Sequence, residues 1–154
     1  MKIIYHCYGG THSSVTAAAV HLGILPLDRL PRPAELLAIP YFDAMDSVDH
    51  GRINFLGLDE YGNEVCFAGQ RGSPGILENI IHGLAGQFSI SPGSYKLVNV
   101  MYKVNISMKI GGVMSRRLRW VRLGRPLVVW GTVRAYAKIT NLVRAVKAQV
   151  GWQQ

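Results

Sequence analysis

The apolar positions of this chain follow two spacings in alternation. Short apolar or alternating runs predict strands at residues 2–8, 52–58, 64–70, 95–104 and 127–130. Apolar residues three or four positions apart predict helices at residues 14–23, 33–39, 75–87, 106–123 and 133–149. Strands that alternate with helices are typical of an α/β fold, so the pattern alone already favours one fold class.

The order of the predicted elements favours a mostly parallel sheet. Strands joined through a helix pair in parallel, with right-handed crossovers. Residues 52–58 and 64–70 differ, because only the short glycine-containing loop 59–63 separates them, and they predict an antiparallel hairpin. We therefore expect a three-layer α/β/α sandwich, formed as a single domain over residues 1–154.

The turn from the first strand into the first helix carries the clearest functional signal. Gly9 and Gly10 permit close backbone approach, and hydroxyl side chains follow at Thr11, Ser13 and Ser14. The N–H groups and the dipole of a helix N-terminus attract anions. The loop 9–14 therefore predicts a site for a phosphorylated ligand. If that ligand is a nucleotide, Mg²⁺ would accompany it and Ser13 or Ser14 would orient the metal-bound phosphate.

This first strand–loop–helix unit is P-loop-like in shape but lacks the P-loop residues. A Walker A loop reads G-x-x-x-x-G-K-[ST]. Here Gly10 is followed by Thr11-His12-Ser13, so the lysine that reaches the terminal phosphates is missing, and so is the first glycine. We expect weak or absent nucleotide hydrolysis. The alternative reading of the same residues is a tight, well-capped turn that holds no ligand.

Cys7 is a second candidate, as a nucleophile. His6-Cys7, five residues and then Ser13-Ser14 resemble the H-C-x5-R-[ST] loop of cysteine-dependent phosphatases. A helix N-terminus stabilises a thiolate, which is the nucleophilic form of cysteine. Ser13 stands where those enzymes carry the arginine that grips the phosphoryl oxygens, which argues against ordinary phosphatase chemistry. Arg71 or Arg117 is the candidate replacement, and the alternative is a buried strand cysteine.

A second glycine-containing loop, residues 69–75, repeats the strand-to-helix design. It carries Arg71 and Ser73 just before the next predicted helix. In a parallel arrangement this loop would lie beside loop 9–14 and contribute Arg71 to one pocket. The alternative is an ordinary turn, capped by Ser73. Within the first loop, His12 is the candidate general acid or base.

The histidines and cysteines do not predict a metal site. None of them shows the C-x2-C or H-x3-H spacing of zinc ligands. His6 and Cys7 are adjacent on a predicted strand, so their side chains should point to opposite faces of the sheet.

Charge divides the chain into two unequal halves. Residues 1–78 hold five Lys/Arg and all nine Asp/Glu, whereas residues 79–154 hold twelve Lys/Arg and no acid. A segment without acids carries a positive potential. The basic half therefore suggests an alternative function as a nucleic-acid, polyanion or protein-binding module centred on Arg116, Arg117, Arg119, Arg122 and Arg125. Two other readings are a basic rim that steers a phosphorylated ligand and a basic flank that meets the acidic half.

The remaining features concern location. No apolar run approaches the roughly 18 residues that span a bilayer, and residues 1–8 lack the features of a signal peptide. Two cysteines are too few for a disulfide framework. We expect a cytoplasmic protein without a membrane span.

Four stretches resemble one family of uncharacterised Firmicutes proteins of about this length, DUF3189. They are the N-terminal MKIIYHCYGGTHSSVTAAAVHLG and the later KIGGVMSRRL, LGRPLVVWGT and AYAKITNLV. The loop CYGGTHSS is the most distinctive of these motifs, and the resemblance covers most of the chain. It implies a small cytoplasmic protein of a spore-forming bacterial lineage. It brings no established activity, so no catalytic residue is carried over from the family.

Overall fold

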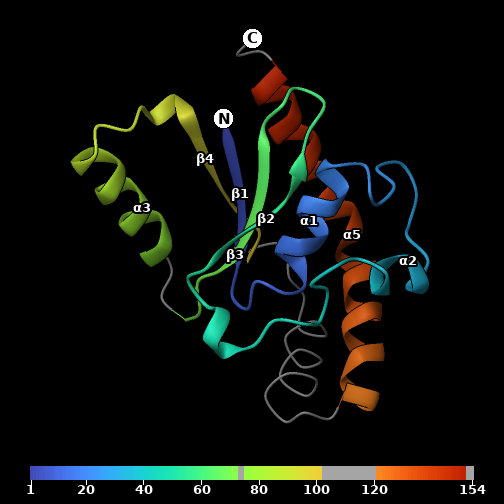
Figure 1. Cartoon of the computed structure of the whole chain (residues 1–154). Helices are drawn as coiled ribbons and strands as arrows, with labels where there is room; N and C mark the ends of the chain where they lie inside the picture. Colours follow the sequence, from blue (N-terminus) through green and yellow to red (C-terminus); the bar gives the residue numbers. More distant parts are fainter. Residues whose placement is uncertain (73–74, 102–120, 152–154) are drawn as a thin grey trace.

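A computed structural model of the chain describes residues 1–72, 75–101 and 121–151 (Figure 1). The predicted helix at 106–123 lies outside the described residues except for its last three positions. The end of the predicted strand 95–104 also lies outside them.

Four strands form one mixed sheet in the order β2-β3-β1-β4. The central strand β1 pairs in parallel with both β3 and β4, and β2 pairs antiparallel with β3. The strands are β1 Lys2–Cys7, β2 Ile53–Leu58, β3 Glu64–Gly69 and β4 Tyr95–Asn99. The predicted α/β class and the predicted hairpin are confirmed.

Helices cover both faces of this sheet (Figure 1). Helix α1 and the long helix α5 lie side by side on one face together with the short α2, and α3 lies on the other. The helices are α1 Ser13–His21, α2 Pro33–Leu37, α3 Ile76–Gln87 and α5 Val121–Gly151, with 3-10 turns η1 Ser47–Asp49 and η2 Pro92–Ser94.

The predicted strand at 127–130 is wrong, because these residues belong to helix α5. A run of four apolar residues fits a buried helix segment as well as a strand. Val128 is fully buried, and the buried positions Thr132, Ala135 and Ile139 follow it at helical spacing. The Thr132 hydroxyl donates to the Val128 carbonyl one turn earlier, so residues 131–132 continue the helix and make no turn. The predicted helix 133–149 is the second part of the same element.

The sheet separates two apolar clusters. Alternate residues of β1 point to opposite faces, as a strand requires. Ile3 and Tyr5 join the large cluster under α1 and α5, whereas Ile4 joins Cys66 and Leu77 in a smaller cluster under α3. The prediction that His6 and Cys7 point apart agrees with this alternation. Most of the core therefore lies on the α1 and α5 face.

Two glycines bring the ends of β1 and β3 into backbone contact. Gly10 has φ of +70°, and a Cβ there would lie 2.6 Å from the backbone nitrogen of Gly69. A Cβ on Gly69 would in turn lie 2.9 Å from the carbonyl carbon and oxygen of Gly9. Since the atoms in the way are backbone, they cannot move aside as a flexible side chain would. Only glycine fits at both positions.

We predict that Gly10→Ala destabilises the protein far more than Gly62→Ala. Both glycines have positive φ, +70° and +75°, but a Cβ at Gly62 meets nothing within 4 Å. The control therefore reports the backbone strain alone, about 1 kcal/mol. Gly10→Ala adds overpacking against the backbone, and its free energy of unfolding should fall by at least about 2 kcal/mol more. Urea denaturation measures both values, and equal losses would contradict this account.

Candidate functional site

The two strand-to-helix loops meet at the carboxyl ends of β1 and β3. The backbone N–H of Gln70 donates to the carbonyl of Cys7 at 2.9 Å, and that of Arg71 donates to the carbonyl of Tyr8 at 2.9 Å. Residues 69–72 therefore lie directly against residues 7–10. In open α/β sheets this edge is the usual position of ligand sites. Ser73, predicted as a cap in the second loop, lies outside the described residues.

The thiol of Cys7 contacts both ends of loop 9–14. Its Sγ shares a hydrogen bond with Ser14 Oγ at 3.1 Å and accepts the backbone N–H of Gly10 at 3.3 Å. Both partners stabilise negative charge on the sulfur when they donate to it. Both residues are buried, Cys7 as the last residue of β1 and Ser14 in the first turn of α1.

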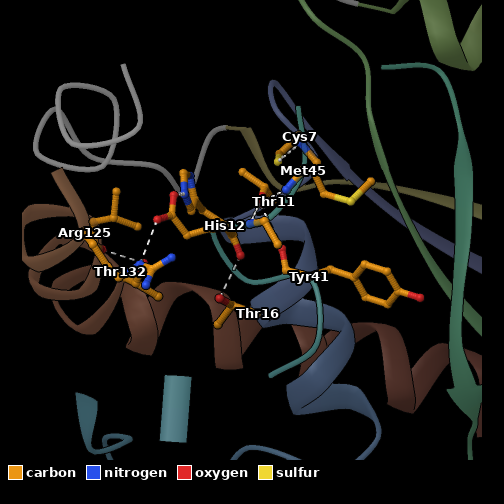
Figure 2. A network of polar contacts seen from close by, with 12 residues as sticks. Cys7, Thr11, His12, Thr16, Tyr41, Met45, Arg125 and Thr132 are labelled. Carbon is orange, nitrogen blue, oxygen red and sulfur yellow. Dashed lines mark hydrogen bonds and ion pairs between the residues drawn. The ribbon is translucent and has the colours of Figure 1, made fainter. Parts of the chain in front are cut away.

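Thr11 uses its side chain to hold a neighbouring segment. Its hydroxyl donates to the carbonyl of Tyr41 at 2.9 Å and accepts the backbone N–H groups of Ala44 and Met45 at 3.0 and 3.1 Å (Figure 2). The sequence predicts that this hydroxyl contacts a ligand. In the structure it fixes residues 41–45 against the loop, which is a positioning role.

His12 is anchored by a buried carboxylate. Its Nε2 lies 3.0 Å from Oδ1 of Asp43, whose side chain is fully buried. The other carboxylate oxygen of Asp43 accepts from Nε of Arg125 on α5 at 3.1 Å. Figure 2 shows His12 between the start of α1 and Arg125. A carboxylate bound to one ring nitrogen orients a histidine and leaves its other nitrogen for acid–base chemistry.

Asp43 belongs to this site, although it is not among the residues predicted from the sequence. Nothing near it has the spacing of a motif, and it lies 31 positions from His12 and 82 from Arg125. Asp43 has φ of +53°, a conformation that Asp tolerates better than most residues do, but this backbone angle is known only from the structure. Arg125 was assigned to a polyanion-binding surface, and its guanidinium is bound to Asp43.

A second polar cluster, also missed, lies on the opposite face of the same sheet edge. His6 is fully buried, with Nδ1 3.0 Å from Oε1 of Gln70. Its Nε2 lies 3.0 Å from Oε1 of Glu78 but outside hydrogen-bond geometry. Burial lowers the pKa of His6 although Glu78 opposes that shift. Asn99, at the end of β4, donates weakly to the same carboxylate at 3.4 Å.

The basic residues of α5 meet acids of the N-terminal half. Besides the pair of Arg125 with Asp43, Arg144 lies 2.8 Å from Asp28 and Lys147 lies 2.7 Å from Glu60. These pairs support the reading that the basic half faces the acidic half of the same chain. Three residues of the predicted polyanion surface, Arg116, Arg117 and Arg119, lie outside the described residues, and the side chain of Arg122 is not described.

Two further features were searched for in the described ranges, a cluster of metal ligands and a membrane-spanning helix. Within residues 1–72, 75–101 and 121–151 no three His, Cys, Asp or Glu side chains gather as metal ligands. No helix in the same ranges has the length and hydropathy needed to cross a bilayer.

The model of one protein family, described as "Protein of unknown function (DUF3189)", matches residues 2–148. The chain belongs to the DUF3189 family. The match spans every described strand and the whole of loop 9–14, so the resemblance noted on the sequence motifs is confirmed. No curated protein and no solved structure matches this DUF3189 chain.

We predict that Asp43→Asn destabilises the protein by about 2 kcal/mol or more. The change removes a buried negative charge that neutralises Arg125, and the remaining amide cannot accept from both partners equally well. Asp28→Asn is the matched control, because it also breaks an aspartate–arginine pair to α5, but at a side chain that is 88% exposed. An exposed pair contributes less than about 1 kcal/mol. Chemical denaturation measures both, and an Asp43→Asn loss as small as the control would contradict the prediction.

Proposed function

We propose that loop 9–14 and the adjoining residues 69–72 bind the phosphoryl group of a small ligand or nucleotide. The observation that carries this proposal is the backbone contact between the two loops at Gly10 and Gly69. It brings residues 69–72, Arg71 among them, to the same sheet edge as the start of α1. A helix N-terminus and an arginine are both common partners of phosphate groups.

The residues of this proposed site divide into those that shape it and those that carry charge or protons. Gly10 lets the loop pack against the backbone of Gly69, and Gly9 is the glycine that can admit a close approach of the ligand to the backbone. Thr11 and Ser14 hold the loop through their own hydrogen bonds. Ser13 is almost fully buried at the first position of α1. His12 and Arg71 are then the side chains assigned to the ligand itself.

We predict that inorganic phosphate or a phosphorylated ligand raises the melting temperature of the protein, and that Arg71→Glu removes this rise. A ligand that binds only the folded state must stabilise it. The panel is phosphate, nucleotides with and without Mg²⁺, and sugar phosphates. Arg71 is preferred to Ser13 for the test because it is exposed, so its replacement disturbs no core packing.

The matched control is Lys138→Glu, which changes the charge equally at an exposed position of α5. The proposal requires that Lys138→Glu keeps the rise in melting temperature. If both variants lose it equally, the ligand responds to overall charge and has no site at residues 69–72. If no compound of the panel shifts the wild-type protein, the proposal is wrong.

A second candidate function, favoured by one specific observation, is a cysteine-dependent phosphatase-like reaction. The position seven residues after Cys7 is Ser14, and its hydroxyl lies 3.1 Å from the Cys7 sulfur. In this reaction the thiolate attacks phosphorus, the alcohol leaves with a proton from His12, and water then cleaves the phosphocysteine. Because Ser13 replaces the expected arginine, Arg71 is the group proposed to hold the phosphoryl oxygens.

We predict that Cys7→Ser abolishes any hydrolysis of p-nitrophenyl phosphate, whereas Cys66→Ser retains it. Cys66 is the matched control because it is equally buried, on the opposite face of the sheet in the small cluster under α3. Release of p-nitrophenol measures the rate. Equal rates in the wild type and Cys7→Ser would exclude the cysteine mechanism and leave the binding proposal untouched.

A further inference from the structure

A buried ring nitrogen on the α3 side of the sheet edge has no hydrogen-bond partner. It is Nε2 of His6, and it is the one buried side-chain nitrogen or oxygen left without a partner among the residues that the structure describes. His6 is fully buried near the carboxyl end of β1. A buried polar atom without a partner destabilises a folded protein, so an unsatisfied one points to a bound group or a chemical role.

The other ring nitrogen of His6 determines what Nε2 can bind. Nδ1 lies 3.0 Å from Oε1 of Gln70, and the amide nitrogen of Gln70 donates to Sδ of Met101. This orientation of the amide presents an oxygen to the ring, so Nδ1 carries the proton and donates it to Gln70. Burial lowers the pKa of His6, which favours the neutral ring. Nε2 of the neutral ring then has a free lone pair.

A carboxylate faces this lone pair. Oε1 of Glu78, in the first turn of α3, lies 3.0 Å from Nε2 of His6 but outside hydrogen-bond geometry. No lysine or arginine of the described ranges forms an ion pair with Glu78, and Asn99 gives it only a long hydrogen bond of 3.4 Å. Two electron-pair donors therefore lie side by side, and a positive ion bound by both would satisfy them together.

The distance between the two atoms fits two ligands of one metal ion. Divalent transition metals bind imidazole nitrogen and carboxylate oxygen at about 2.0–2.2 Å. Two such ligands lie about 3 Å apart at the right angle of an octahedral ion and about 3.4 Å apart at the tetrahedral angle. The observed 3.0 Å matches the octahedral arrangement. The oxygen must also lie off the axis of the nitrogen lone pair, where the ion itself sits, and its position outside hydrogen-bond geometry agrees with this.

The surroundings of His6 are those of a metal-bound histidine. Such a histidine almost always donates its second ring N–H to a carbonyl or carboxylate oxygen, which orients the ring. Oε1 of Gln70 takes that place here. His6 comes from the end of β1, Gln70 directly follows β3, and Glu78 belongs to α3, on the sheet face opposite α1 and α5 (Figure 1). Three separate elements thus converge at the sheet edge where α/β folds place their ligands.

We propose that His6 and Glu78 bind an octahedral divalent transition-metal ion, with Gln70 orienting the imidazole and water completing the coordination. The described ranges bring no third His, Cys, Asp or Glu to these two ligands, whereas a structural zinc site has four ligands. The imidazole disfavours Mg²⁺ and Ca²⁺, which select oxygen ligands. The site lies on the α3 side of the sheet, away from the thiol of Cys7, so the inference does not rest on the proposed phosphate site.

The test is a calorimetric titration of the full chain with Ni²⁺, which binds such ligands more tightly than Mn²⁺ or Co²⁺ does. We expect one ion per chain, and a dissociation constant at least about tenfold higher in Glu78→Gln, because an amide oxygen without charge is a poor ligand for this ion. The side chain of Glu78 is 34% exposed, so this replacement of the same shape leaves the core packing intact. His6→Gln should abolish the binding.

Two variants serve as matched controls and should bind Ni²⁺ as the wild type does. Glu64→Gln removes the same charge at a side chain that is 47% exposed at the other end of the sheet. His82→Gln removes an exposed histidine from the same helix α3. Far-UV circular dichroism verifies that each variant folds, and if His6→Gln does not fold, Glu78→Gln decides the outcome alone.

Three results would overturn the proposal. The first is a wild-type protein that does not bind Ni²⁺. The second is binding that Glu78→Gln leaves unchanged, which would place the ion elsewhere on the chain, for example at the terminal amino group. The third is an equal loss in Glu64→Gln or His82→Gln, which would mean that Ni²⁺ follows the overall charge or an exposed imidazole. None of these results bears on the phosphate site, because the titration contains no phosphate.

Discussion

The carboxylate of Asp43 is fully buried and is bound by His12 from one side and by Arg125 from the other. Removing an ionised carboxylate from water costs several kcal/mol, so it remains charged only when partners satisfy it. That requirement fixes three parts of the chain together: the N-terminus of α1, the segment after α2, and α5. The Thr11 hydroxyl adds three hydrogen bonds to the same segment, residues 41–45. Loop 9–14 is consequently held in place by this segment.

The backbone contact of Gly10 with Gly69 determines how the candidate site is assembled. Parallel pairing of β1 with β3 brings two strand-to-helix loops to one edge, and the missing side chains let them touch. A phosphoryl group at this edge would meet the start of α1 and the loop of Arg71 together. Cys7 and His6, adjacent in sequence, end on opposite faces of β1, so the edge has two chemically different sides. The thiol belongs to the α1 side, and the buried imidazole beside Glu78 belongs to the α3 side.

Ion pairs within the chain join its acidic half to its basic half. The acids that lie before residue 79 and the bases of α5 are far apart in sequence, but α5 runs along α1 and α2 on the same face of the sheet. Of the three pairs they form, that of Asp43 is buried, whereas those of Asp28 and Glu60 are at the surface and contribute little to stability. Much of the basic character of the described part of α5 is therefore neutralised by the protein itself.

The sequence by itself determined the features that depend on neighbouring residues. Strand periodicity, helical spacing and glycine-containing turns are local features of this kind. The structure has a strand or helix within a few residues of the predicted place at 2–8, 52–58, 64–70, 14–23 and 75–87, and a turn at 9–14. The family was also visible in the sequence motifs. Only the tertiary structure decided that 127–130 is helical, that the Thr11 hydroxyl forms hydrogen bonds with residues 41–45, and that Asp43 orients His12. Those outcomes depend on burial and on contacts between residues 30 or more positions apart, and such contacts leave no periodic signal in the sequence.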